Sequence, residues 1–304
     1  PDANGQGHVD AILRAVGDAR VAAILCTHTH RDHSPAAAPL KAATGAPIIG
    51  CAPLALKDDG PRADSAFDPD YAPDRVLTDG ERLSGDGWTI EAVATPGHTS
   101  NHLCYNLVES GALFTGDHVM AWSTSVVSPP DGDMAAYMAS LSKLYDREDR
   151  VYYPAHGPAV TKPRQLVRGM LGHRKQRERQ ILRELEKGTR VIPVMVAHMY
   201  KGLDPRLTGA AGRSVLAHLF DLRTRGVLSE AEFQRAKERL AMARFEIATC
   251  AISGAVGPVA NVEPRVEELY SLVQAELRRS GFERLLKRGS RRSNSGYTFY
   301  LARR

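Results

Sequence analysis

The segment Thr27-His28-Thr29-His30-Arg31-Asp32-His33 constrains this 304-residue chain more than any other feature. It follows directly on Val21–Cys26, a run of six apolar residues that predicts a buried strand. Neutral imidazole and carboxylate groups are ligands that zinc accepts, and three His with one Asp on one loop can diverge toward two neighbouring cations. We therefore predict a metal site at the end of a buried strand.

Three further candidate ligands stand where other apolar runs end. Breakers such as Pro96-Gly97 stop a strand at these points. Folds of the α/β type place their sites at such strand exits, so residues distant in sequence are expected to meet there. The candidates are His98 after the predicted strand Trp88–Ala94, Asp117 after the predicted hairpin Leu103–Val108 with Ala112–Thr115, and His156 after the predicted strand Val151–Tyr153.

Helices are predicted between these strands and through most of the second half of the chain. In the first half, Ser34 and Pro35 are expected to begin a helix that ends at Gly45, before a strand at Ala46–Ile49. The other predicted helices are Met134–Tyr145, Lys162–Lys187, Thr189–Leu203, Gly209–Arg225, Glu230–Ala243 behind a capping box at Ser229–Glu232, and Pro264–Arg279. Gly289–Leu301 predicts a hairpin that turns at Asn294-Ser295-Gly296, and its strand at Tyr297–Leu301 is interpreted as a displaced wing strand.

Charge divides the chain into two unlike halves. Residues 1–160 contain 11 Lys and Arg against 21 Asp and Glu, whereas residues 161–304 contain 29 against 14. Such an asymmetry indicates two modules with different tasks, and the basic half is a candidate for contact with nucleic acid. A charged run is usually only a solvated face, so that reading stays open.

Cysteine usage and hydropathy favour an intracellular protein. The four cysteines (Cys26, Cys51, Cys104 and Cys250) stand singly without CxxC spacing, which predicts free and mostly buried thiols. No apolar run approaches the roughly 20 residues that cross a bilayer. We therefore expect a cytoplasmic protein that does not enter the membrane.

The order of the seven candidate ligands resembles that of the metallo-β-lactamase superfamily, whose pattern is HxHxDH, then a distal His, an Asp and a last His. The resemblance implies two zinc ions, with iron or manganese as alternatives, that share a water molecule. It implies that Asp32 is catalytic as the partner for the proton of that water. It assigns His28, His30 and His98 to the first ion, Asp32, His33 and His156 to the second, and Asp117 to a bridge between them.

The resemblance also implies a fold. This is an α/β fold, the αββα metallo-β-lactamase sandwich. The chain is expected to lack the first strands of that sandwich, as an N-terminally truncated fragment would. Residues 113–120 and 133–141 resemble the beta-lactamase-like protein 2 group and its bacterial relatives, which add a C-terminal helical, winged-helix-like domain. We predict a hydrolase domain at 1–160, a basic helical connector at 161–188, a winged-helix-like domain at 189–228 and an atypical basic extension at 229–304.

Residues around the ligands are candidates for supporting roles. His102 is interpreted either as a group that orients a ligand or as a structural histidine. His118 is expected to pack in the core, because it points away from Asp117 in an extended segment. Trp122 and Ser123 follow Asp117 closely and are candidates for substrate binding.

Three functions fit these residues. The first is a zinc-dependent hydrolase of an ester, thioester or phosphodiester, with cleavage of single-stranded RNA as one activity that the resemblance suggests. The second is a thioesterase similar to hydroxyacylglutathione hydrolase. The third is a non-catalytic nucleic-acid-binding protein, which gives no reason to keep all seven ligands. True zinc β-lactamases commonly have Cys where this chain has Asp117, which disfavours antibiotic hydrolysis. An oligomeric assembly is left open.

Overall fold

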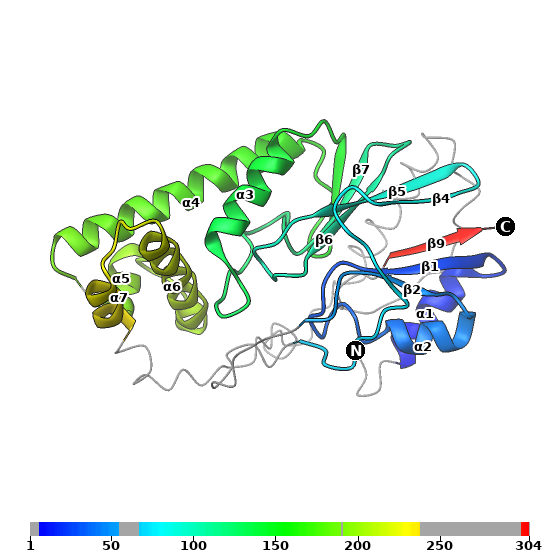
Figure 1. Cartoon of the computed structure of the whole chain (residues 1–304), viewed down its shortest axis with the longest axis horizontal. Helices are drawn as coiled ribbons and strands as arrows, with labels where there is room; N and C mark the ends of the chain where they lie inside the picture. The colour runs from blue at the N-terminus through cyan, green and yellow to red at the C-terminus, as the bar shows by residue number, and fades with distance from the viewer. Residues whose placement is uncertain (1–5, 55–66, 190, 238–298, 304) are drawn as a thin grey trace.

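The computed structural model describes residues 6–54, 67–189, 191–237 and 299–303. Two β-sheets stack against each other in the N-terminal part of the chain (Figure 1). The first sheet has the strand order β3-β2-β1-β9, in which β1, β2 and β3 run parallel and β9 pairs antiparallel with β1. Its strands are β1 Arg20–Cys26, β2 Ile48–Gly50, β3 Arg75–Val76 and β9 Phe299–Arg303.

The second sheet has the strand order β4-β5-β6-β7-β8. Its first four strands form an antiparallel meander, and β8 joins parallel to β7 after a helical crossover. The strands are β4 Arg82–Gly85, β5 Trp88–Ala94, β6 Leu103–Leu107, β7 Ala112–Gly116 and β8 Val151–Pro154.

Helices cover the outer faces of both sheets and complete four layers. Helices α1 (Gln6–Val16) and α2 (Ala37–Thr44) lie on the first sheet, whereas α3 (Met134–Tyr145) and the first half of α4 (Pro163–Glu186) lie on the second. The mixed α/β architecture that the sequence indicated is thereby confirmed.

Strand β5 shows why the second sheet is an internal layer. Successive side chains of a strand point to opposite faces. Ile90 and Ala92 belong to the core between the sheets, while Val93 packs with α3 in a separate core. The inner strands of this sheet are mostly buried on both faces and carry few charged residues, whereas the edge strand β4 is largely exposed.

A second, helical unit follows α4. Its elements are α5 Ile192–Met199, a 3-10 turn Pro205–Leu207, α6 Thr208–Thr224 and α7 Glu230–Lys237. Phe233 of α7 and Leu219 of α6 share one apolar core with Ile181 of α4. The predicted capping box is confirmed, because the Ser229 backbone N–H donates to Glu232 Oε2 at 3.0 Å and the Glu232 N–H donates to Ser229 Oγ at 3.3 Å.

Two local predictions were wrong. The helix predicted to begin at Ser34-Pro35 begins at Ala37, because the Ser34 hydroxyl donates to Asp68 Oδ2 at 2.7 Å instead of capping the helix. The segment interpreted as a wing strand contains β9, whose backbone lies beside β1 in the first sheet. Gly45 ends α2 in the left-handed conformation, as predicted.

Several predictions fall outside the described residues. They are the helix Pro264–Arg279, the turn at Asn294-Ser295-Gly296, the end of the helix Glu230–Ala243 and the state of Cys250. The thiols of Cys26, Cys51 and Cys104 are free and buried. Among the helices that the structure describes, none combines the length and the apolar character needed to cross a membrane.

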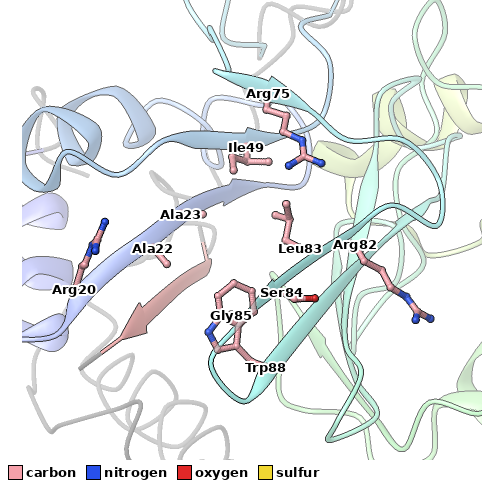
Figure 2. A pocket seen from close by; sticks show the side chains of 10 residues that line it. All are labelled: Arg20, Ala22, Ala23, Ile49, Arg75, Arg82, Leu83, Ser84, Gly85 and Trp88. Carbon is pink, nitrogen blue, oxygen red and sulfur yellow. The ribbon is translucent and has the colours of Figure 1, made fainter.

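A cavity of about 400 Å³ opens between the two sheets. Figure 2 shows that Ala22 and Ala23 of β1 and Ile49 of β2 border it on one side, and that Leu83 of β4 and Trp88 of β5 border it on the other. None of the seven candidate ligands lines this cavity, so it is separate from the predicted metal site.

His218 lies buried in α6 at 2% exposure. Burial, together with nearby Arg174 and His173, lowers its pKa to about 3. Because its folded-state pKa lies below the ordinary value, the unfolded chain takes up a proton more readily. The free energy of unfolding is therefore unaffected by the titration of this residue above pH 6.5. Between pH 6.5 and pH 3 the titration of His218 lowers it by about 1.4 kcal/mol per pH unit.

Replacing His218 with Gln removes this titration while keeping a polar side chain of similar size. We expect the His218→Gln variant to gain about 2 kcal/mol relative to the wild type between pH 7 and pH 5. Urea denaturation at both pH values measures the difference. Equal pH slopes for the two proteins would show that His218 does not contribute to acid sensitivity.

Candidate metal centre

The seven candidate ligands come from the ends of strands in both sheets. The loop after β1 supplies His28, His30, Asp32 and His33, whereas the second sheet supplies His98 after β5, Asp117 after β7 and His156 after β8. The Thr27 carbonyl accepts a hydrogen bond from the Leu103 N–H at 2.8 Å and joins the two sheets at this edge. Strand exits that are distant in sequence therefore meet at one place.

Three imidazole rings form the first group. His30 Nδ1 lies 3.1 Å from His28 Nε2 and 3.1 Å from His98 Nε2. One ring nitrogen has a single proton or a single lone pair, so hydrogen bonding accounts for only one of these contacts. Zinc–nitrogen bonds of about 2.0–2.1 Å, arranged tetrahedrally, would separate the ligand atoms by about 3.4 Å. The spacing therefore suits three nitrogens that converge on one ion.

The second group is centred on carboxylates. His156 Nε2 lies 3.3 Å from Asp32 Oδ2, and His33 Nε2 lies 3.6 Å from the same oxygen. Two further sets of residues have ligand atoms that all lie within 4.8 Å of one another. The first is His28, His33 and Asp117, and the second is Asp32, His33 and His156.

Asp117 lies between the two groups. Its Oδ2 is 3.7 Å from His98 Nε2 on one side, while its Oδ1 is 3.4 Å from His156 Nε2 and 3.5 Å from His33 Nε2 on the other. Oδ1 is buried and accepts no hydrogen bond from the described residues. A buried carboxylate oxygen in this state needs a cation, so the donor set fits a metal ion here.

The pKa values of the groups differ in a way that suits metal binding. Burial and then His98 lower the pKa of His30 to about 3, and burial and neighbouring histidines lower that of His28. Both rings are therefore neutral with free lone pairs. Burial opposes ionisation of Asp117, but His33 and His156 outweigh it and hold its pKa below the ordinary range. Asp117 is accordingly a carboxylate at neutral pH.

His102 supports Asp117 from behind. Its Nε2 accepts a hydrogen bond from the Asp117 backbone N–H at 3.2 Å, so its Nδ1 carries the proton and donates to Thr95 Oγ1 at 2.8 Å. The ring is buried, and burial is the main cause that lowers its pKa. His102 is thus a buried histidine that also fixes the backbone of a candidate ligand.

Two glycines permit the close packing around the cluster. Gly116, with φ of +49°, precedes Asp117, and a Cβ there would lie 2.6 Å from His102 Nε2. Gly97, with φ of +135°, precedes His98, and a Cβ there would lie 2.3 Å from the Cα of Tyr137. A side chain at Gly116 would have to displace the ring of His102, and one at Gly97 would have to displace the backbone of Tyr137.

The loop after Asp117 passes between two candidate ligands. The Ala121 N–H donates to the His156 carbonyl at 3.4 Å, and the Val126 carbonyl accepts from His98 Nδ1 at 2.7 Å. Trp122 is 59% exposed on this loop, and Ser123 is exposed beside it. The structure thus places both predicted substrate-binding residues beside the cluster, and their contact with substrate stays a prediction.

His118 does not join the cluster. Its ring is buried, and the ring centroid lies 4.7 Å from that of Tyr137 of α3. Burial, and then His98, lowers the pKa of His118 to about 3. The ring therefore packs in the core, as predicted, although residues 117 and 118 form a turn and not an extended segment.

The residues that sequence reasoning missed are those that hold the loop 121–128. Ser125 and Val126 contact candidate ligands through their hydroxyl and carbonyl groups, and Arg174 of α4 contacts Ser125. Backbone carbonyls leave no signal in the side-chain pattern, and Arg174 is hidden in a basic helix that reads as solvated.

The fold is a four-layer αββα sandwich, and a cluster of His and Asp side chains that could hold metal ions lies at one edge of its two sheets. Residues 2–156 match the Metallo-beta-lactamase superfamily, and the chain belongs to that superfamily. Residues 192–234 match the beta-lactamase associated winged helix domain, so the C-terminal unit predicted from the resemblance is confirmed as a winged-helix domain.

Curated relatives are identical to this chain at about a third of the aligned residues. An atrochrysone carboxyl ACP thioesterase of Aspergillus fumigatus is 34% identical over 176 residues, which is 58% of this chain and 51% of the relative. The lactamase-like protein adaB of Aspergillus niger is 33% identical over 150 residues, which is 45% of this chain and 46% of the relative. The chain thus spans about half the length of these relatives.

Among solved structures, a beta-lactamase domain protein from Burkholderia ambifaria superposes with a TM-score of 0.53. It is 20% identical and covers 66% of this chain and 68% of its own. This likeness concerns the fold alone.

Proposed function

We propose that this protein is a metal-dependent hydrolase that cleaves a thioester with an activated water molecule. The observation that carries the proposal is the position of Asp117, whose two oxygens face separate groups of ligands. We assign His28, His30 and His98 to one divalent ion, Asp32, His33 and His156 to a second, and Asp117 to both. Nitrogen and carboxylate donors of this kind suit zinc, and they also suit iron and manganese.

When bound, such a pair of ions lowers the pKa of water toward neutrality and polarises a carbonyl group. The protein positions the remaining participants. The water oxygen bonds to the acyl carbon, the carbon–sulfur bond breaks, and the proton of the water passes to Asp32 and then to the departing thiolate. Asp32 suits this task because its side chain is 50% exposed, at the mouth of an otherwise buried cluster.

The relatives favour a thioester over the other electrophiles. Four of the proteins similar to this chain carry the name ACP thioesterase. The exposed Trp122, on the loop that bonds His98 and His156, offers an apolar surface for an acyl group. We infer a small-molecule or carrier-bound acyl thioester as substrate, in the cytoplasm, with Trp122 and Ser123 as its contacts.

Cleavage of single-stranded RNA is the second candidate. The observation in its favour is the exposed cationic side of α4, formed by Arg168, Lys175, Arg179 and Arg183, next to a winged-helix domain. Phosphate contacts of this kind would make the activity strongly dependent on salt. We propose the connector 161–188 as the place of such contacts, between a hydrolase domain at 1–160 and a winged-helix domain that begins at 189.

One experiment separates the two substrates. The full chain, loaded with zinc, is assayed against S-lactoylglutathione, an aryl thioester and a single-stranded RNA, before and after chelation. We expect thioester turnover that a chelator removes and added zinc restores. RNA cleavage without thioester turnover would replace the proposal by its alternative. RNA binding without turnover of any substrate, in protein that holds its metal, would instead support a non-catalytic role.

A further inference from the structure

Arg174 lies on the buried side of α4, with 3% of its surface exposed. Its Nη1 donates to Ser214 Oγ of α6 at 3.1 Å, its Nη2 donates to the carbonyl of Ser125, and its guanidinium lies over the ring of Tyr137, 5.2 Å from the centroid. The side chain therefore touches the helical unit on one side and the loop beside the metal cluster on the other.

This burial is costly, because no carboxylate of the described residues lies within ion-pair distance of Arg174. Removing a guanidinium from water costs several kcal/mol unless hydrogen bonds and a counter-charge compensate. A carbonyl dipole, a hydroxyl and an aromatic face offset only part of this cost. A Met or Leu would fill the same space without it, so packing alone does not explain an arginine at this position.

The contacts of Ser125 explain it better. The Ser125 hydroxyl lies 2.5 Å from the carbonyl oxygen of Asp117 and 2.9 Å from that of His118, and its one proton is shared between these two acceptors. Tyr137, under the guanidinium, donates from its hydroxyl to the same His118 carbonyl at 3.2 Å. Arg174 thus contacts the backbone of Ser125 and the ring of Tyr137, the two residues whose hydroxyls bond the carbonyls of Asp117 and His118.

The neighbouring residue, Val126, extends this control to a second candidate ligand, His98. The Val126 carbonyl accepts the hydrogen bond of His98 Nδ1, so the proton sits on Nδ1 and the Nε2 lone pair faces the cluster. Because Ser125 and Val126 are consecutive, a shift of the Ser125 carbonyl moves the acceptor of His98 as well. One guanidinium therefore bears on Asp117, which we assign to both ions, and on His98, which we assign to the first.

We propose that Arg174 is a positioning residue of the metal centre, which fixes the loop 121–128 against α4 and α6 and thereby holds Asp117 and His98 in their ligating orientation. The inference rests on the metal-binding part of the proposed function. It also assigns α6, through Ser214, a supporting role toward the metal centre.

The test compares Arg174→Met with Arg174→Lys and with a matched control, Arg177→Met. Arg177 lies on the same helix, stacks on Tyr200 at 4.1 Å and donates to the Met199 carbonyl at 3.3 Å. Its other hydrogen-bond partners among the described residues, His173 and Gln180, lie on α4 itself and not on the loop 121–128. Zinc affinity is measured by competition with a chromophoric chelator, and the ligand field is measured from the visible spectrum of the cobalt-substituted protein. Urea unfolding reports the stability of each variant.

We expect Arg174→Met to weaken zinc binding by about 10- to 100-fold, to alter the cobalt spectrum, and to lower kcat by a similar factor with little change in KM. Arg174→Lys should recover part of each loss, and Arg177→Met should keep the wild-type spectrum and affinity even if it is equally destabilised. Ser125→Ala, which leaves Arg174 in place, should alter the spectrum in the same direction.

A folded Arg174→Met protein with wild-type zinc affinity and cobalt spectrum would overturn the inference. If Arg174→Met fails to fold, the Arg174→Lys and Ser125→Ala variants decide, and wild-type spectra in both would overturn it equally. Failure of the wild-type chain itself to bind zinc would instead contradict the proposed function. Failure of the inference about Arg174 and failure of the proposed function are therefore distinguishable.

Discussion

The Asp117→Ala variant is expected to lose turnover by on the order of a thousandfold or more, since several kcal/mol of charge stabilisation depends on the ions that this carboxylate joins. Its Oδ1 and Oδ2 face the two ligand groups, and its backbone is fixed by His102. Turnover and metal content by elemental analysis are measured on the same preparation, and both are expected to fall.

A suitable control is Asp146→Ala, which removes an exposed carboxylate at the end of α3 without touching the cluster. It should keep both turnover and metal. Retained turnover in Asp117→Ala protein that has verifiably lost its metal would eliminate the proposed mechanism.

The second large effect is expected at Asp32. The Asp32→Asn variant removes a charge and a proton acceptor while keeping the size of the side chain, and general base catalysis contributes about 10²- to 10⁴-fold. We expect kcat/KM to fall within this range. The group of His28, His30 and His98 does not include Asp32, so about one ion per chain should stay bound.

Arg31→Ala is the matched control, because Arg31 precedes Asp32 on the same exposed loop and bonds only the Phe67 carbonyl through its Nε. Its kcat/KM should stay near that of the wild type. A fall of less than tenfold in the Asp32→Asn variant would contradict the assigned role.

The site could be predicted from the sequence because its ligands sit at strand exits, where polar residues interrupt apolar runs. The strand Trp88–Ala94 and the helix Met134–Tyr145 were predicted with the bounds that the structure shows. Their apolar periodicity is complete, and clear stop signals flank both. The convergence of His98, Asp117 and His156 on the loop after β1 followed from topology.

Elements defined by long-range contacts could not be predicted in the same way. Helix α1 was missed, although Val9, Ile12, Leu13 and Val16 pack at helical spacing against the first sheet. The short strands β3 and β4 carry little apolar signal, because they lie at sheet edges. The contact between α4 and the loop after Asp117 depends on the crossing of helices, which local propensity does not encode.

The two sheets each contribute part of the cluster, and this division has a consequence for the whole molecule. Ions that bind there would cross-link the two sheets, through ligands separated by more than a hundred residues in the sequence. Ligands that bind only the native form add to its stability according to their free concentration. If the proposed ions bind, the melting temperature of this protein will rise with the concentration of free divalent metal in its buffer.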